Sequence, residues 1–233
     1  KKALDPKVKV VIINNPNNPT GAIYSRETLE KIAEVLKEAE KEFGHPIYLI
    51  TDEPYRELVY VDKEIVFIPD LYDNTIIAYS WSKSLSIPGD RLGYLAVSPK
   101  SDNVEEFMAA ATVANRISGD TNAPSIIQLA VERCLDAQVD IPYYKKNAED
   151  LYKIVTEAGF TAVVPQGAFY LWVKSPVADE KELVAAAKEE RILAVPGSAF
   201  ACPGYIRLSF CIANETIQRS AESFAKLGKK YFG

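Results

Sequence analysis

The residues best suited to chemistry gather around one lysine, Lys83. In the segment YSWSKSLSIPGDR, hydroxyls at Ser80 and Ser82 flank this lysine, and Arg91 follows eight residues after it. A primary amine can form a Schiff base with an aldehyde, while a guanidinium and neighbouring hydroxyls can hold a phosphate. Most lysines are solvated surface residues, but this one follows an apolar run at 75–79 that predicts a buried strand. The segment therefore indicates a site for a covalently held, phosphorylated aldehyde.

A carboxylate and a phenol follow a second apolar run. Asp52 comes directly after residues 47–51, and Tyr55 lies three residues further on, where it could face the same pocket. Ligands gather at the carboxyl ends of parallel strands, which favours a site. The competing interpretation is an aspartate that caps the following turn, and for Asp52 considered alone the two are about equally good.

Two arginines and one asparagine each carry a structural alternative. Arg91 could pair with its neighbour Asp90, an interaction worth little if exposed. Arg207 lies in an apolar strand, where a charge needs solvent, an ion pair or a bound anion. Asn18 belongs to the segment NNPNNPTG, which could be a plain turn. A rigid turn is also a good way to fix Asn18 in place.

Alternating strands and helices must position these residues, which predicts an α/β fold with a mainly parallel sheet. A second part begins near residue 141 and mixes strands and helices without strict alternation, which predicts a smaller α+β domain. The expected domains are 1–140 and 141–233. The expected strands are 8–13, 47–51, 75–79, 92–97, 161–164, 168–173 and 205–210, and the expected helices are one from Ser25, then 102–117, 124–139, one ending at Gly159, 179–190 and one from Asn214.

Composition narrows the function classes. The 233 residues are 48% hydrophobic, enough for a substantial core, and the net charge of −5 argues against a broad nucleic-acid surface. Three cysteines without paired spacing and a single histidine argue for a reducing cytosol and against a zinc site. We expect these cysteines to be buried free thiols. No signal peptide and no apolar stretch long enough to cross a bilayer is evident.

Four segments, in this order, resemble the class I/II aminotransferases, the fold-type I pyridoxal-phosphate enzymes of which aspartate aminotransferase is typical. They are residues 14–21 (NNPNNPTG), 52–55 (DEPY), the Lys83 segment and 205–210 (YIRLSF), and residues 195–200 (VPGSAF) also match. The resemblance implies the later part of the large pyridoxal-phosphate domain in residues 1–140. It implies the small C-terminal α+β domain in residues 141–233.

The resemblance also implies roles around the cofactor ring. Lys83 would hold pyridoxal 5′-phosphate as a Schiff base and later act as general base and acid. Asp52 would pair with the pyridine nitrogen and keep it protonated, so that the ring accepts electrons. Tyr55 and Asn18 would hydrogen-bond the phenolic oxygen of the ring. Lys83, Asp52 and Tyr55 are thus the expected catalytic residues.

Anionic groups would be held elsewhere. By resemblance, Arg91 pairs with the cofactor phosphate, helped by Ser80, while Ser82 is a further partner for the phosphate or the backbone. Arg207 would clamp the α-carboxylate of the substrate through its planar guanidinium, with Asn18 as a second contact. Arg116 is a candidate for binding the distal carboxylate of an acidic substrate, and an aromatic or aliphatic amino acid is the alternative substrate.

The implied reaction is the transfer of an amino group from an L-amino acid to a 2-oxo acid. The resemblance further implies a cytoplasmic homodimer with no metal and with no membrane or nucleic-acid partner. Two alternatives stay open: a pyridoxal-phosphate-dependent C–S β-lyase, and the aminotransferase-like effector domain of a transcription regulator.

The opening sequence KKALDP reads like the end of a helix, so we expect an N-terminally truncated fragment. The resemblance places a phosphate-binding loop, an aromatic residue that stacks on the ring and a tyrosine that reaches the neighbouring subunit in the absent segment. We therefore expect weak cofactor binding, little turnover and exposed strand edges in this chain.

Overall fold

A computed structural model describes residues 2–119 and 121–233 and divides the chain into two compact units. Unit 1 comprises the residues up to Asn15 together with Tyr24–Glu57 and Lys63–Val139. Unit 2 comprises Pro16–Ile23, Leu58–Asp62 and Asp140–Gly233. Two short segments of the first 140 residues thus pack with the C-terminal part of the chain.

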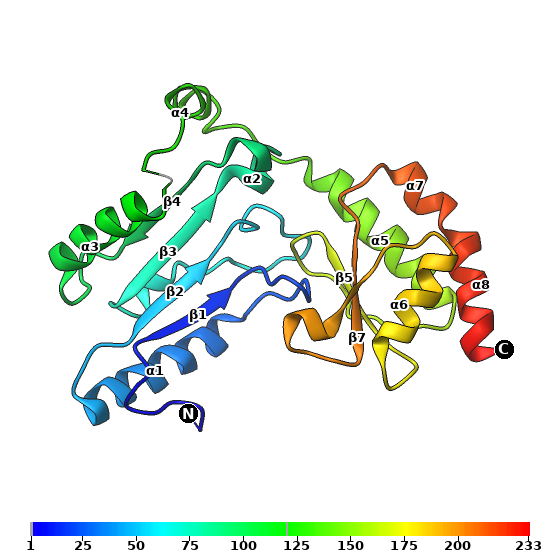
Figure 1. Ribbon diagram of the computed structural model, residues 1–233, viewed down its shortest axis with the longest axis horizontal. Coiled ribbons are helices and arrows are strands. Elements are labelled where there is room, and N and C mark those ends of the chain that lie inside the picture. The colour runs from blue at the N-terminus through cyan, green and yellow to red at the C-terminus, as the bar shows by residue number, and fades with distance from the viewer. Residues whose placement is uncertain (1, 120) are drawn as a thin grey trace. The chain divides into compact units, whose positions relative to one another are not determined.

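Unit 1 is built on a four-stranded sheet in the order β1-β2-β3-β4 (Figure 1). The first three strands are parallel and β4 runs antiparallel to β3, so the expectation of a mainly parallel α/β sheet is confirmed. The strands are β1 (Val10–Asn14), β2 (Tyr48–Asp52), β3 (Thr75–Ser80) and β4 (Gly93–Val97), and the helices are α1 (Arg26–Phe43), α2 (Trp81–Ser84), α3 (Val104–Ile117) and α4 (Ser125–Glu132).

Helix α1 fixes the strand that ends in Asp52. The Ser25 side chain caps its start by accepting a hydrogen bond from the amide of Thr28, and Gly44 ends it in the left-handed conformation. Leu29 and Leu36 lie on its buried face, in one core with residues of β2. Burial of each such leucine contributes about 1.5–3 kcal/mol. This packing holds β2, and therefore its carboxyl end, in place.

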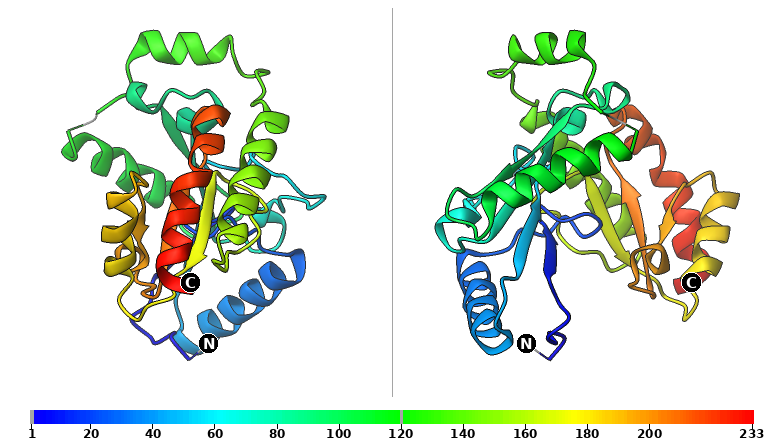
Figure 2. Two further views of the ribbon diagram at one scale, coloured as in Figure 1. Left: turned by 90° about the vertical axis from the view of Figure 1, so that its right-hand side faces the viewer. Right: turned by 60° about the vertical axis from the view of Figure 1, so that its left-hand side comes forward.

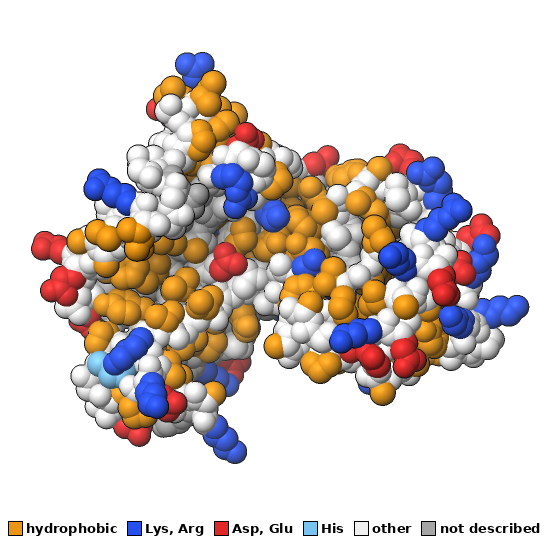
Figure 3. All heavy atoms as spheres, in the orientation of Figure 1, with side chains coloured by type: hydrophobic (Ala, Val, Ile, Leu, Met, Phe, Trp, Pro, Cys, Tyr) orange, Lys and Arg blue, Asp and Glu red, His pale blue; other side chains and the backbone are white. Residues whose placement is uncertain are grey.

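Unit 1 also leaves much apolar surface exposed. Figure 3 shows hydrophobic side chains gathered over its strands and over α3. Strands β1 and β4 are the edges of the sheet, and Ile12 and Leu95 on them are 67% and 55% exposed. Helix α3 buries none of its side chains, and α4 buries only Val131.

Unit 2 contains an antiparallel sheet in the order β5-β7-β6, with helices packed along it (Figure 2). Helix α5 contacts β5, α7 and α8. The strands are β5 (Tyr170–Lys174), β6 (Val195–Pro196) and β7 (Tyr205–Ser209), and the helices are α5 (Ile141–Glu157), α6 (Glu180–Glu189), α7 (Asn214–Arg219) and α8 (Ala221–Phe232). This is a small α+β arrangement, as expected.

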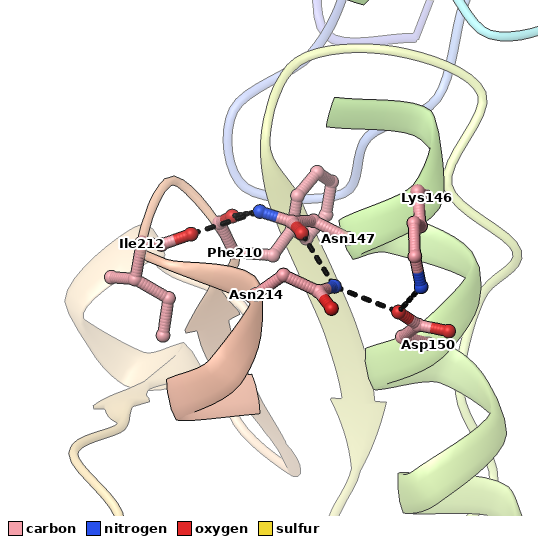
Figure 4. A network of polar contacts seen from close by, with 6 residues as sticks. All are labelled: Lys146, Asn147, Asp150, Phe210, Ile212 and Asn214. Atoms are coloured by element: carbon pink, nitrogen blue, oxygen red, sulfur yellow. Dashed lines mark hydrogen bonds and ion pairs between the residues drawn. The ribbon is translucent and has the colours of Figure 1, made fainter. Parts of the chain in front are cut away.

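Buried polar contacts fix the chain where it leaves β7 (Figure 4). The fully buried side chain of Asn147 on α5 donates to the carbonyls of Phe210 and Ile212, at 3.0 and 2.9 Å. Asn214 in turn donates to the side-chain oxygen of Asn147 and to the carboxylate of Asp150, at 2.8 and 2.7 Å. Because buried carbonyls need partners, Asn147 ties the end of β7 to α5.

Several predicted elements were wrong in extent. Residues 161–164 form no strand and make a single bridge, from Ala162 to Val173. Val164 is 58% exposed and Pro165 has no amide to donate, so the ladder does not continue. The helix expected at 124–139 ends at Glu132. The amides that follow donate hydrogen bonds to carbonyls three residues earlier, which is the pattern of a tightened last turn. The last helix is broken at Ser220 into α7 and α8.

The cysteines are free but not buried, which corrects the expectation. Cys134, Cys202 and Cys211 are all exposed. Cys134 lies beyond the end of α4, Cys202 in a turn and Cys211 beyond β7. Connecting segments run over the protein surface, so these cysteines are exposed even though the thiol side chain is weakly polar.

The described residues contain neither a membrane-spanning helix nor a cluster of metal ligands. None of their helices combines the length and the apolar character needed to cross a membrane. Within the same residues, no group of three histidine, cysteine or acidic side chains could hold a metal ion.

Candidate active site

Lys83 lies on the short helix α2, which begins where the buried strand β3 ends. Its side chain is half-buried, and the Nζ atom lies 5.9 Å from the centre of the Tyr55 ring. Tyr55 itself is only 4% exposed. The structure thus brings together two of the predicted residues, an amine and a phenol, on the same side of unit 1.

Helix α2 is held by a tyrosine that the sequence did not single out. Tyr79, on β3, donates from its hydroxyl to the carboxylate of Glu57 at 2.9 Å and lies 2.8 Å from the hydroxyl of Ser84. Its ring packs edge-on against Trp81. Burial is the main reason why the pKa of Tyr79 is raised to about 12. A neutral phenol therefore anchors both ends of the helix that carries Lys83.

Asp52 is the last residue of β2, and Asn14 lies opposite it at the end of β1. The Asn14 amide donates to the Asp52 carboxylate and to its backbone carbonyl, both at 2.9 Å. Burial raises the pKa of Asp52, and the bond from Asn14 offsets part of that rise. A half-buried carboxylate of this kind is stabilised by a nearby cation. Asn14 was quoted within a motif but was not expected to act on Asp52.

The predicted phosphate-binding groups lie on the segment that follows β3. Ser80 ends β3 without capping α2 through its side chain, and Ser82 lies on α2. Arg91 is exposed, has a left-handed backbone and donates from Nη1 to the carbonyl of Pro88 at 2.7 Å. Among the ion pairs of the described residues, none joins Arg91 to Asp90, so the structural alternative considered for Arg91 is absent there.

A glycine brings β4 close to this segment. Gly93 pairs with Ser80, and a Cβ at Gly93 would lie 2.5 Å from the carbonyl oxygen of Tyr79. Any larger residue would push β4 away from the end of β3. The close approach keeps the serine and arginine segment folded back on the strand end that precedes Lys83.

Arg207 lies at the centre of β7 in unit 2, between two aromatic faces. Its guanidinium carbon is 4.2 Å from the centre of the Tyr170 ring and 4.7 Å from that of Phe200. Its Nη1 donates to the side-chain oxygen of Asn18 at 2.7 Å. Over the described part of the chain, Arg207 forms no ion pair with a carboxylate. Neutral partners thus orient a cation whose charge stays available to an anion.

The two units divide the predicted residues between them. Unit 1 holds Lys83, Asp52, Tyr55, Ser80, Ser82 and Arg91, and unit 2 holds Asn18 and Arg207. The residues that the sequence did not single out are Asn14, Glu57, Tyr79, Tyr170 and Phe200. Their contacts depend on strand register and loop path, which no local spacing encodes.

The donor set of unit 1 fits pyridoxal 5′-phosphate. Lys83 offers an amine for the aldehyde, and Asp52 offers a half-buried carboxylate for the ring nitrogen. Tyr55 offers a hydroxyl for the phenolic oxygen, and Arg91 with Ser80 offers donors for the phosphate.

Comparison with known proteins supplies the family. The family model described as aminotransferase class I and II matches residues 1–224. Aspartate aminotransferase from Thermotoga maritima is 34% identical over 224 residues, which are 93% of this chain and 55% of that protein. Aspartate/prephenate aminotransferase from Thermus thermophilus is 32% identical over 235 residues, which are 97% of this chain and 58% of that protein.

Solved structures agree. An amino transferase from Eubacterium rectale has a TM-score of 0.95 and 42% identity, over all of this chain and 58% of that one. The Thermus thermophilus aspartate aminotransferase with maleate has a TM-score of 0.85 and 29% identity, over 97% and 58%. The chain therefore spans little more than half the length of these relatives. By sequence and by fold, it belongs to the class I and II aminotransferases, a family that depends on pyridoxal 5′-phosphate.

Proposed function

We propose that this chain carries cofactor- and substrate-binding residues of an aminotransferase that moves an amino group from an L-amino acid to a 2-oxo acid. The observation that carries the proposal is in unit 1. An amine lies over a buried tyrosine ring, and a half-buried carboxylate ends the strand beside the one that precedes that amine. Residues 1–140 would contribute to the large cofactor-binding domain and residues 141–233 to the small domain.

Pyridoxal 5′-phosphate, when bound, supplies an aldehyde that takes up the amino group and a protonated ring that accepts electrons from the substrate's α-carbon. Lys83 would hold it through the Nζ amine. The carboxylate of Asp52 would keep the proton on the ring nitrogen, and the burial that raises the pKa of Asp52 strengthens that pairing. Tyr55 and Asn18 would donate to the phenolic oxygen.

Lys83 would also move the proton. Once its amine is free, Nζ would take the proton from the α-carbon of the substrate as general base and deliver it to the C4′ carbon of the cofactor as general acid. The half-buried position of Lys83 supports this role, because a side chain with few neighbours would lose more conformational entropy on reaching the substrate.

The anions would be held by arginines. Arg91, with Ser80 and Ser82, would bind the cofactor phosphate. Arg207 would bind the substrate α-carboxylate, and its two ring faces and its bond to Asn18 support that assignment because they fix the plane of the guanidinium. We extend the proposal to a homodimer of the whole protein. We also propose that the protein is cytoplasmic, because its three cysteines are exposed and form no disulfide.

The test is a covalent label. The chain is incubated with pyridoxal 5′-phosphate and reduced with borohydride, and the modified peptides are mapped by mass spectrometry. We expect the label at Lys83, its loss in Lys83→Ala and its retention in Lys100→Ala, a matched change at an exposed lysine of the same unit. A label spread over many lysines would count against the site.

Measurements of turnover distinguish an aminotransferase from a β-lyase. In the whole protein, the labelled site predicts transfer of an amino group from members of a panel of L-amino acids to 2-oxoglutarate, and loss of that transfer in Lys83→Ala. Release of pyruvate and ammonia from a cysteine thioether without any 2-oxo acid acceptor would identify a β-lyase instead. Activity that Lys83→Ala retains would overturn the proposed role of the lysine.

A further inference from the structure

A buried carboxylate in unit 2 has no part in the functions above. Glu180, at the start of α6, is 2% exposed. Its Oε1 atom accepts a hydrogen bond from the amide of Ser198 at 2.9 Å, and its Oε2 atom accepts one from the amide of Gly204 at 3.0 Å. The two donors lie near opposite ends of one loop. We call residues 197–204 the clasp loop, because a single carboxylate closes it.

Helix capping does not explain this carboxylate. The cap of α6 is Asp179, whose side chain accepts from the amide of Lys181. Glu180 instead points its carboxylate at the clasp loop. The bonds from Gly204 and Ser198 lower the pKa of Glu180 to about 2, so the carboxylate is ionised at neutral pH and far below it.

The clasp loop has a backbone that needs such support. Ala201 and Gly204 both have left-handed conformations, with φ of 53° and 87°. A Cβ at Gly197 would lie 2.2 Å from the carbonyl oxygen of Cys202, so the loop closes tightly on itself. Two charge-assisted bonds to backbone amides are the kind of contact that holds a loop of this shape.

The clasp loop supplies one wall of the Arg207 site. Phe200, within the loop, places its ring 4.7 Å from the guanidinium carbon and packs edge-on against Trp172. Gly204 is followed directly by β7, the strand that carries Arg207. Glu180 therefore fixes both the ring that faces the guanidinium and the start of its strand.

We propose that Glu180 is a positioning residue for carboxylate recognition, acting through the clasp loop and Phe200 on the plane of the Arg207 guanidinium. This inference rests on the proposed function of Arg207. Bidentate binding of a carboxylate depends on the orientation of the guanidinium plane. If the clasp loop loosens, the Phe200 ring no longer holds the Arg207 guanidinium in one orientation. Arg207 then loses rotamer freedom when the ligand binds, and this entropy cost weakens binding.

The first experiment measures the chemical reactivity of Arg207 in the absence of any ligand. The whole chain is treated with phenylglyoxal, and modification of Arg207 is measured by mass spectrometry relative to exposed Arg219 of the same unit. Glu180→Gln keeps the size of the side chain and removes its charge. We expect the Arg207 to Arg219 ratio to rise in Glu180→Gln and in Phe200→Leu, and to stay unchanged in Glu182→Gln, an exposed change on the same helix.

The second experiment measures the affinity of the cofactor-loaded chain for 2-oxoglutarate by calorimetry. We expect Glu180→Gln to weaken binding about tenfold, Glu180→Asp to weaken it less, and Glu182→Gln to leave it unchanged. The double variant Glu180→Gln/Phe200→Leu should lose no more affinity than the worse single variant, because both changes act through one ring.

The outcomes separate the two proposals. An unchanged modification ratio in Glu180→Gln, or fully additive losses in the double variant, would overturn the positioning role. Should Glu180→Gln fail to fold, Glu180→Asp and Phe200→Leu decide by the same ratio. Wild-type affinity in Arg207→Lys would instead overturn the proposed function of Arg207 itself.

Discussion

Two arginines with the same expected task, binding an anion, are built in opposite ways. Arg91 in unit 1 is exposed, and its guanidinium donates to a carbonyl only three residues earlier in the chain. Arg207 in unit 2 lies in a central strand, between the rings of Tyr170 and Phe200 and bonded to Asn18. The first is held by its own turn, and the second by residues that are distant in sequence.

The difference teaches where each anion site obtains its affinity. A guanidinium that is already oriented loses little entropy when a carboxylate binds, so Arg207 is preorganised. Arg91 has its orienting contact within an exposed turn, so ordering around it must come with the ligand. We therefore expect substitutions near Arg207 to act on the cofactor-free chain, and those at Arg91 to act mainly when the phosphate is present.

The largest effect is expected from Arg207→Lys. A lysine keeps the charge but loses the planar pair of donors and the stacking on two rings. We expect affinity for 2-oxoglutarate in the cofactor-loaded chain to fall about 100-fold, which corresponds to roughly 3 kcal/mol. Calorimetry with Arg219→Lys as the exposed control checks this. A loss of the same size in the control would remove the contrast.

Asn147→Leu tests whether the rigidity of unit 2 depends on its buried amide. The change leaves the buried carbonyl of Phe210 and the part-buried carbonyl of Ile212 without their donor, and we expect the unfolding free energy to fall by about 1–3 kcal/mol. The measurement is denaturant unfolding, with Asn115→Leu as control because Asn115 also donates to a carbonyl but is exposed. Equal losses in the two variants would show that burial is not what matters.

Asp52→Asn should stabilise the cofactor-free chain at neutral pH, by less than Asn147→Leu destabilises it. Because folding raises the pKa of Asp52 above its ordinary value of 3.8, the folded state bears a cost for the ionised form. That cost is fully present above the folded pKa and disappears as pH falls below 3.8. Thermal unfolding from pH 7 downward should show the advantage of the variant fading. A constant advantage would point to another cause.

Arg91→Lys should have the smallest effect. In the cofactor-free chain we expect the unfolding free energy to change by no more than about 0.5 kcal/mol, as for other exposed positions. Arg207→Lys, measured in the same way, should cost more. If Arg91→Lys were the more destabilising of the two, the distinction between a locally held and a preorganised arginine would fail.

Apolar runs predicted the strands that position the site because burial on both faces leaves an uninterrupted hydrophobic signal. That is why residues 75–79 located both β3 and the end from which Lys83 follows. Residues 161–164 were also apolar but do not form a strand, since their pairing with β5 is an isolated bridge and Pro165 has no amide with which to extend it. Local sequence does not say which apolar segment finds a continuous partner.

The site was predictable only to the extent that chemistry was local. Lys83, Ser80 and Arg91 share one segment and one motif. Asn14 meets Asp52 through the register of β1 and β2, and Glu180 meets the clasp loop across 18 and 24 positions in sequence. Such supporting residues have ordinary types and spacing, so only the fold reveals them.

The aromatic packing gives each unit its own optical reporter. The chain has two tryptophans. Trp81 lies two residues before Lys83 and packs on Tyr79 and Tyr94 in unit 1, whereas Trp172 packs on Phe200 and Tyr205 in unit 2. Replacing either one with phenylalanine leaves a single emitter beside one of the two sites. Intrinsic fluorescence can then follow cofactor capture and carboxylate capture as separate signals in one unlabelled chain.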